Sequence, residues 1–387
     1  MKKEIIIKIT QSFNRRILTE NFDSDDFHSD FFEGILGVVY YLSTINSILK
    51  DEAFNEKIAD LINIVFNRVS SGDYLISRYS NLSYGLSGLG YVIHDLVEKG
   101  MLDEVHLEPF IDIDLLIYKS ALKDIESGNF DFMNGVPGVL FYFNAKNSNY
   151  RDEIIDKMYA KLETVKYPFY NHISELYNKG INFGIAHGLV GLLLVLANIY
   201  EEGNQTDHVK QLMEHCIKII LESQVESTVN GKKIYYPYNL YYNETGELIN
   251  QSTTRLAWCS GDLAVSLALC KIGTLLEKKD CLELSDQLGQ SCVQRRTLPE
   301  TGIHLPIFCH GSSGAACMYK KLYELTSKEH YLTEYNYWFT QTLEYLEDKV
   351  NSKDKNDFNM ILGLTGAVLM INNIEDLISG WDKIFLI

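Results

Sequence analysis

The amino-acid sequence predicts an all-α protein built as a closed ring, an α/α toroid with seven inner and seven outer helices. Three observations predict this fold: a glycine pattern that recurs seven times, six of them as a full pair, an alternation of wholly apolar with amphipathic segments, and terminal repeats as apolar as the middle ones. The 387-residue chain has only 6 prolines, and no linker rich in Gly, Ser and Pro is visible. We therefore expect residues 1–387 to form a single toroid domain.

Each repeat is marked by a Gly-x-x-Gly pattern followed by an apolar run. The first glycines are residues 34, 85, 135, 188, 261, 311 and 363, so the successive intervals are 51, 50, 53, 73, 50 and 52 residues. In the fifth copy, Ala264 replaces the second glycine. Glycine in a helix costs roughly 1 kcal/mol relative to alanine, so its recurrence needs a reason. Tight packing at the narrow end of the ring is one reason, and loops that converge there would also form a site.

Two helices are predicted in each repeat. Segments that follow the glycines, such as 38–45 and 192–197, have little polarity on any face, which is typical of buried helices. Between them lie amphipathic segments such as 56–69, with apolar residues at helical spacing. The alternation predicts two concentric layers. A solenoid is disfavoured because its terminal repeats would carry polar caps.

The 73-residue interval predicts an excursion from the ring. We expect the extra residues between 225 and 254, a stretch rich in Tyr, Asn, Gly and Thr. Asn230-Gly231 within it is a hairpin-type turn signal. The stretch is predicted to be a small β-like excursion or a loop over the ring mouth, not a separate domain.

Charge and hydropathy exclude several classes of function. Lys and Arg number 35 against 52 Asp and Glu, and the net charge of −17 disfavours nucleic-acid binding. The apolar runs are too short for a membrane span, and charges interrupt every apolar stretch at the N-terminus, so we expect no transmembrane segment and no signal peptide. We expect a cytoplasmic protein whose seven cysteines stay reduced.

Three consecutive repeats place a Cys or His just before their glycines. These residues are His187 in the fourth copy, Cys259 in the fifth, and Cys309 and His310 in the sixth. If the ring closes, Cys259, Cys309 and His310 meet at one end of it. Two thiolates and an imidazole are typical zinc ligands, and three protein ligands leave the fourth position open, as in catalytic sites. The other five cysteines are expected to be small core residues.

Further polar residues could reach the same end of the ring. His187 is either a fourth ligand or a general acid/base beside an open metal site, with a hydrogen-bonded core histidine as the alternative. Asp131, four residues before Gly135, either faces the cavity or caps a turn. Arg255, four residues before Cys259, could pair with a carboxylate, hold an oxyanion, or simply lie on the surface.

Three sequence blocks resemble the signature blocks of the lanthionine synthetase C-like proteins, the lantibiotic cyclases. The blocks are Gly184-Ile-Ala-His-Gly-Leu-Val-Gly191, Arg255-Leu-Ala-Trp-Cys259 and Cys309-His-Gly311. One block alone is a weak signal, whereas all three in this order, within a repeat that covers nearly the whole chain, are specific. The resemblance implies a seven-fold toroid with zinc at its mouth. The implied zinc ligands are Cys259, Cys309 and His310, and the implied active-site residues are His187, Asp131 and Arg255.

The reaction implied by this resemblance is cyclisation of a dehydrated precursor peptide. A substrate cysteine adds to dehydroalanine or dehydrobutyrine, which gives a (methyl)lanthionine thioether ring. The resemblance also implies a dehydratase and an export transporter as partners in a biosynthetic complex, through which the protein could lie peripherally at the membrane.

Two positions depart from the family. Asn134 stands where an acidic residue is often found, and Ser260 follows the first zinc cysteine where many relatives carry Tyr or His. No proton-transfer role therefore carries over to Ser260.

Other functions remain as alternatives at this point. A zinc thiol alkylase of the protein prenyltransferase type usually has six repeats and a basic cluster for diphosphate, and neither feature is present. A glycoside hydrolase with an α/α barrel would need paired carboxylates at the loops, where only Asp131 qualifies. A non-catalytic scaffold that holds a peptide or a glutathione-like thiol on zinc belongs to a different class of function.

Overall fold

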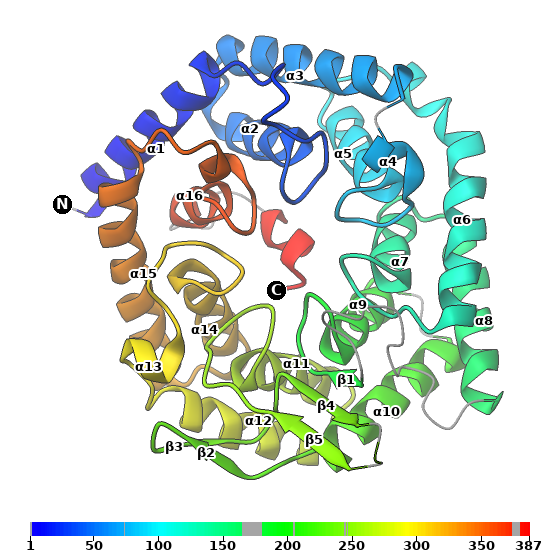
Figure 1. Ribbon diagram of the computed structural model, residues 1–387, viewed down its shortest axis with the longest axis vertical. Helices are drawn as coiled ribbons and strands as arrows, with labels where there is room; N and C mark the ends of the chain where they lie inside the picture. The colour runs from blue at the N-terminus through cyan, green and yellow to red at the C-terminus, as the bar shows by residue number, and fades with distance from the viewer. Residues whose placement is uncertain are drawn as a thin grey trace.

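The computed structural model describes residues 2–72, 74–164, 180–203, 206–243, 245, 247–373 and 380–387. Within these residues the helices form two concentric layers (Figure 1). The inner layer consists of α2 (Ile35–Leu49), α5 (Leu86–Glu98), α7 (Val136–Ala145), α9 (Leu189–Glu201), α11 (Asp262–Leu275), α14 (Ser312–Thr326) and α16 (Thr365–Asn372). The outer layer consists of α1 (Lys2–Thr19), α3 (Glu52–Ser70), α6 (Phe110–Ser127), α8 (Asn149–Thr164), α10 (Asp207–Glu222), α12 (Lys279–Cys292) and α15 (Glu329–Lys349).

Contacts between the first and last helices of each layer close the ring. Each inner helix contacts its two neighbours in the layer, and the last of them, α16, contacts α2. In the outer layer, α1 contacts α15. The α/α toroid predicted from the sequence is thereby confirmed. Short helices occupy some connections: α4 (Tyr74–Arg78), α13 (Leu298–Thr301), η1 (Glu104–Leu107) and η2 (Lys355–Phe358). One more short helix, η3 (Trp381–Phe385), follows α16.

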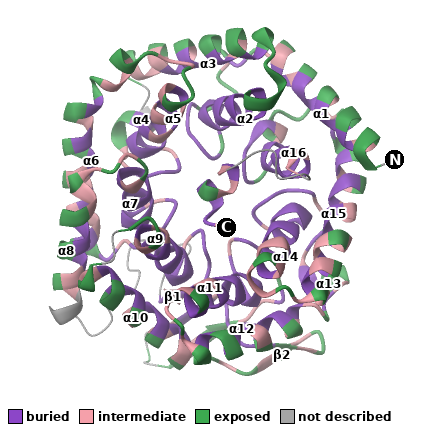
Figure 2. Ribbon diagram, turned by 180° about the vertical axis from the view of Figure 1, so that it is seen from behind, coloured by how far each residue is buried: buried purple, intermediate pink, exposed green. Residues whose placement is uncertain are grey.

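The two layers differ in burial as their sequence patterns require. The inner helices are buried over most of their length, whereas the outer helices bury one side and expose the other (Figure 2). In α3 the buried side includes Ile58, Leu61, Ile62 and Val65, which recur at helical spacing. The core is therefore the space between the two layers together with the packed interior of the inner one.

The repeated glycines leave room for neighbouring repeats to pack. A Cβ atom on Gly88 would lie 3.0 Å from the Cβ of Phe31 in the preceding repeat, and one on Gly138 would lie 2.8 Å from the Cβ of Leu82. The nearest atom in both cases is a carbonyl oxygen of the glycine's own loop, at 2.2 Å. Real Cβ atoms rarely approach so closely, so close packing on both the loop and the preceding repeat accounts for these second glycines. At Gly261 the backbone φ of 99° adds a second requirement, because a left-handed conformation favours glycine.

Backbone hydrogen bonds join the loops of successive repeats at the glycine end of the inner helices. The amide of Ser83 donates to the carbonyl of Met133 across 3.0 Å. Farther round the ring, the amide of Cys259 donates to the carbonyl of Cys309 (3.2 Å), whose own amide donates to the carbonyl of Ile361 (2.9 Å). These bonds fix the two cysteine-bearing loops side by side.

The expected excursion within residues 225–254 is present as short strands. The strands of this region are β2 (Ser227–Val229), β3 (Lys232–Ile234), β4 (Asn239–Tyr242) and β5 (Leu248–Gln251), and β1 (Ile181–Asn182) joins them from the preceding loop. Strands β2 and β3 form an antiparallel hairpin around Asn230 and Gly231, whose φ angles of 50° and 74° suit the predicted turn. Strand β4 pairs with β1 and β5 in a second, antiparallel sheet. Residues 244 and 246 of the excursion lie outside the described residues.

A buried ion pair attaches this excursion to the ring. The side chains of Arg295 and Asp262 are fully buried, with 2.6 Å between Nη2 and Oδ2. Asp262 also accepts the amide hydrogen of Tyr236 (2.9 Å), and Arg295 donates to the carbonyl of Lys233 (2.8 Å). Because Asp262 opens α11, the same pair anchors the start of the helix that follows Cys259.

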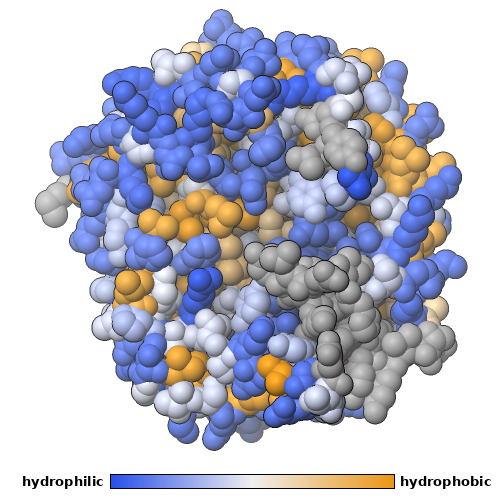
Figure 3. Space-filling view, viewed as in Figure 1, coloured by the Kyte–Doolittle hydropathy of each residue, from blue (hydrophilic) through white to orange (hydrophobic). Residues whose placement is uncertain are grey.

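The polarity of the surface and the burial of the cysteines are as expected from the sequence. The face of the ring in Figure 3 is mainly hydrophilic, with its apolar residues in separate patches. Among the described helices, none is both long and apolar enough to cross a membrane. The cysteines expected in the core are buried and unpaired, and they are Cys216, Cys270, Cys281, Cys292 and Cys317.

Candidate metal centre

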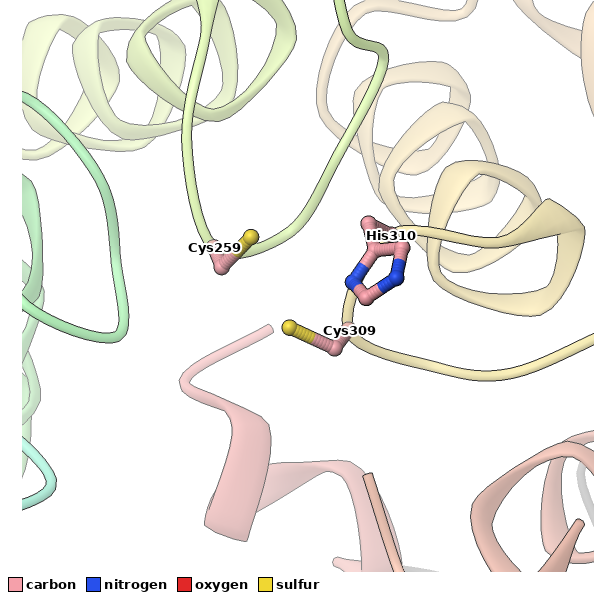
Figure 4. Close-up of side chains that lie close together, drawn as sticks. All are labelled: Cys259, Cys309 and His310. Carbon is pink, nitrogen blue, oxygen red and sulfur yellow. The ribbon is translucent and has the colours of Figure 1, made fainter. Parts of the chain in front are cut away.

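Cys259, Cys309 and His310 form a cluster at the glycine end of the inner helices. Cys259 precedes α11, whereas Cys309 and His310 precede α14, so two neighbouring repeats supply the group. One potential ligand atom from each residue lies within 4.8 Å of the other two. Figure 4 shows the two thiol groups and the imidazole ring around a common space. The structure thus brings together the three side chains that share one position in the sequence repeat.

This donor set fits zinc. A tetrahedral zinc ion holds sulfur at about 2.3 Å and imidazole nitrogen at about 2.0 Å, so its ligand atoms lie roughly 3.5–4 Å apart. The spacing of at most 4.8 Å therefore requires only small side-chain adjustments. Thiolates and imidazole favour zinc over magnesium and calcium, which prefer oxygen ligands. Three protein ligands would leave the fourth tetrahedral position to a substrate atom.

The two thiols of the cluster differ in acidity. The pKa of Cys259 is held well below its ordinary value, first by a hydrogen bond from the Cys309 thiol and then by the neighbouring His310, although burial opposes the shift. The same thiol–thiol hydrogen bond, together with burial, raises the pKa of Cys309. Without a cation the pair therefore keeps one proton, and a divalent cation would replace it.

A His–Asp pair lies in the adjoining repeats. His187 Nδ1 is 2.7 Å from Asp131 Oδ2, and the carboxylate is almost fully buried. Burial favours the neutral ring, but the charge and hydrogen bond of Asp131, with a contribution from Cys259, outweigh it and raise the pKa of His187. A raised pKa keeps this imidazole protonated at higher pH, which suits a proton donor.

Asp131 also organises its own loop. Its other oxygen, Oδ1, accepts the amide hydrogen of Asn134 across 2.9 Å. The residues at the same repeat position, Asp30 and Asn81, accept the corresponding amides in their loops at 2.7 and 3.0 Å. The two possibilities raised by the sequence, a turn aspartate and a site aspartate, therefore both hold for Asp131 in geometric terms. The hydrogen bond to His187 distinguishes Asp131 from Asp30 and Asn81, which occupy the same position in other repeats.

Gly184 allows the His187 loop to approach the metal cluster. A Cβ atom on Gly184 would lie 1.7 Å from the carbonyl oxygen of Cys259, so no larger residue fits without moving one of the loops. The glycine is thus a steric requirement for bringing His187 close to Cys259.

All these groups line one cavity of about 1270 Å³. Its lining includes the residue immediately before the first glycine of every repeat: Glu33, Tyr84, Asn134, His187, Ser260, His310 and Leu362. The seven loops therefore converge on a common space, and neighbouring positions in that space carry the Cys259–Cys309–His310 cluster and the His187–Asp131 pair.

Sequence and structure comparisons identify the family to which this chain belongs. A family model described as lanthionine synthetase C-like protein matches residues 25–386. The chain belongs to the lanthionine synthetase C-like family. It is 23% identical over 388 aligned residues to the nisin biosynthesis protein NisC of Lactococcus lactis subsp. lactis, covering 92% of this chain and 87% of that protein. Among solved structures it is similar to nisin cyclase, with a TM-score of 0.72, 20% identity, and coverage of 99% and 97% of the two chains.

Arg255 and Ser260, which the sequence analysis also named, differ in exposure in this lanthionine synthetase C-like chain. Arg255 is exposed and lines the cavity, and among the described residues its guanidinium has no ion pair with a carboxylate. The suggested pairing with a carboxylate is thus not seen among the described residues. Ser260 is buried, with Oγ 3.9 Å from Cys259 Sγ.

The sequence analysis missed several lining residues. Glu33 and Tyr84 occupy the same repeat position as His187 and His310, so this position was the signal that could have identified them. Asp124 also lines the cavity, and burial raises its pKa to about 6. It lies at the end of an outer helix, in a part of the repeat that carries no sequence signal.

Proposed function

We propose that this lanthionine synthetase C-like protein is a zinc-dependent cyclase. It adds cysteine thiols of a dehydrated precursor peptide to dehydroalanine or dehydrobutyrine and so forms (methyl)lanthionine rings. One observation carries the proposal: a three-ligand zinc-type cluster and the hydrogen-bonded His187–Asp131 pair line the same cavity. Family membership and the similarity to NisC support it.

The reaction is an addition that neither gains nor loses mass. The substrate sulfur forms a bond to the β-carbon of the dehydrated residue, and the electrons of the double bond move to the adjacent carbonyl as an enolate. The α-carbon then takes a proton, while the substrate thiol gives one up. Zinc, when bound, would lower the pKa of the substrate thiol from its free value of about 8.5, so that sulfur is available as a thiolate near neutral pH.

The chain's own residues divide the remaining tasks. His187 would deliver the proton through Nε2, because Nδ1 is engaged by Asp131. Asp131 fixes the ring orientation and favours its protonated form. Arg255, exposed within the cavity, would stabilise the negative charge that develops on the enolate oxygen. Ser260 is assigned no proton transfer.

The chemistry also defines the setting that we propose. The site thiols and the substrate cysteine must stay reduced, which favours the cytoplasm. The dehydrated residues would come from a dehydratase, and the family resemblance implies an export transporter for the cyclised product. We propose both as partners, with peripheral membrane contact through them.

We expect Asp131→Asn to move the pH profile of cyclisation to lower pH. Cyclisation should fall as pH rises through the pKa of His187, because the neutral ring cannot donate its proton. The substitution removes the carboxylate that raises this pKa, so burial then lowers it and the fall begins earlier. Above the new pKa the rate should drop about tenfold for each further pH increase of one. The measurement is the rate of ring formation between pH 5.5 and about 8.5.

Asp30→Asn is the matched control for this variant. Asp30 occupies the same loop position in the first repeat and accepts the equivalent amide hydrogen, that of Glu33. Burial raises its pKa to about 6, so a neutral side chain is a modest change there. If both variants gave the wild-type pH profile, the role of Asp131 would be confined to its loop.

A non-catalytic scaffold that holds a peptide on the metal is the second candidate, because Ser260 stands beside the cluster where many relatives of the resembled family carry Tyr or His. Co-expression with a candidate precursor and its dehydratase separates the two functions. A cyclase should leave the dehydrated peptide with fewer alkylatable thiols at unchanged mass. A scaffold should bind the peptide and leave its thiols reactive.

A further inference from the structure

The short helix η3 lies inside the ring rather than in either layer (Figure 1). Its residues Trp381, Ile384 and Phe385 are at most 4% exposed, and Leu386 directly after it is 1% exposed. The sequence repeat does not extend to these residues. The helices of the ring already pack on one another without η3. The burial of these residues inside the ring therefore suggests that η3 has a role of its own at this place.

Phe385 contacts the residues that precede the two metal-type cysteines. Its ring stacks on that of Phe308, with centroids 3.6 Å apart and planes at 19°. Its carbonyl oxygen accepts a hydrogen bond of 2.7 Å from the indole Nε1 of Trp258, and the two rings meet edge to face at 6.0 Å. Phe308 precedes Cys309, and Trp258 precedes Cys259.

These two contacts single out the metal-bearing repeats. The residue three positions before the first glycine is fully buried in every repeat, and the seven are Phe31, Leu82, Phe132, Ile185, Trp258, Phe308 and Met360. Four of the seven are aromatic, and within the described part of the chain only Trp258 and Phe308 of these four have ring contacts with η3. Segment η3 is therefore placed under the two loops that carry the thiols.

The cysteine loops lie between η3 and the substrate cavity. Cys259 and Cys309 line the cavity of about 1270 Å³, and no residue of η3 does. Trp381 and Lys383 of η3 line a different cavity of about 620 Å³, together with residues from the opposite ends of the inner helices. One side of each loop thus faces the peptide site, while the residue before each cysteine rests on Phe385.

We propose that Phe385 is a positioning residue of the metal centre, which it supports through Trp258 and Phe308. This inference rests on the zinc site of the proposed function. A tetrahedral site tolerates little error in ligand position, and residues that orient ligands typically contribute 10–100-fold to metal affinity. Phe385 fixes both cysteine loops at once, one through a hydrogen bond to its backbone and the other through its ring.

The test is zinc affinity of the intact protein, measured by competition with a chromophoric chelator. Phe385→Ala removes the stacked ring, and we expect it to weaken zinc binding about 10–100-fold. The Co²⁺-substituted variant should also show changed d–d and thiolate charge-transfer bands. Ile384→Ala is the matched control, because Ile384 is adjacent and equally buried but has no ring to stack on Phe308. It should lower the melting temperature while keeping the affinity and the cobalt spectrum.

A second variant covers the case in which Phe385→Ala fails to fold. Trp258→Phe keeps an aromatic ring but loses the indole N–H that bonds to Phe385. It should weaken zinc binding by a smaller factor and also alter the cobalt spectrum. Wild-type affinity and spectrum in the folded variants would overturn the positioning role, as would equal losses in Phe385→Ala and Ile384→Ala. A wild-type protein that binds no zinc would contradict the proposed function itself.

Discussion

Cys309→Ala should reduce the zinc content from one ion per chain to nearly none and bring ring formation down to its spontaneous rate. Cys309 supplies one of three clustered ligand atoms, and its thiol also stabilises the Cys259 thiolate. Two remaining ligands cannot hold zinc tightly, and the substrate thiol would then ionise only near its free pKa of about 8.5. Elemental analysis of the purified protein and the rate of thiol loss from a dehydrated peptide measure the two effects.

Cys270→Ala is the matched control for this substitution. Cys270 is a buried cysteine of α11, nine residues beyond Gly261, where burial raises its pKa and no second thiol or imidazole joins it in a cluster among the described residues. The variant should keep its zinc and its activity, with a modest loss of stability from the small cavity. Full zinc content in the Cys309→Ala protein would rule out the proposed site.

His187→Ala should keep its zinc but lose most of its cyclisation rate. The ring is bound to Asp131 and lies on a different repeat from the clustered ligands, so the cluster does not depend on it. Loss of a positioned general acid typically costs 10²–10⁴-fold in rate. Single-turnover ring formation with saturating peptide, alongside zinc analysis, measures the effect.

His208→Ala tests whether a His–Asp pair matters only at the cavity. His208 Nδ1 is 2.7 Å from Asp156 Oδ1, the same separation as in the His187 pair, but it lies on the outer helix α10 and does not line the cavity. This variant should cyclise at the wild-type rate. Loss of zinc from His187→Ala would instead identify His187 as a fourth ligand and the site as structural, which would contradict the enzyme function.

Most of the fold was predictable because the ring repeats itself in the sequence. Glycines at near-equal intervals mark positions where each inner helix packs closely on the backbone of its own loop, and the contact of Gly138 with Leu82 shows that second glycines also pack on the preceding repeat. The alternation of buried and half-buried segments predicted the two layers, and Asn230-Gly231 predicted the hairpin. The pairing of β1 with β4 was not predictable, since a two-residue strand leaves no periodicity in sequence.

The site was predictable where it follows the repeat and unpredictable elsewhere. A shared repeat position indicated that Cys259, Cys309 and His310 would meet, before any geometry was known. The bond between His187 and Asp131 depends on side-chain directions in two loops, which spacing alone does not specify. The same limit applies to Arg255, whose suggested pairing with a carboxylate is not seen among the described residues.

The role proposed for η3 could not be predicted from the sequence at all. Its residues carry neither the glycine pair nor a Cys or His, so no pattern links Phe385 to the cysteine loops. The link is tertiary: a ring stacked across 77 residues of sequence and one indole hydrogen bond across 127 residues. Such contacts appear only when the ring is assembled.

The most direct test of the central claim follows a synthetic peptide with one dehydroalanine and one cysteine during incubation with zinc-loaded protein at pH 7. Alkylatable thiol and peptide mass are measured together over time. We predict that the thiol disappears while the mass stays constant, and that the Cys309→Ala protein gives only the spontaneous rate. A protein that retains zinc and binds the peptide, yet leaves the thiol reactive at the spontaneous rate, would contradict the cyclase function.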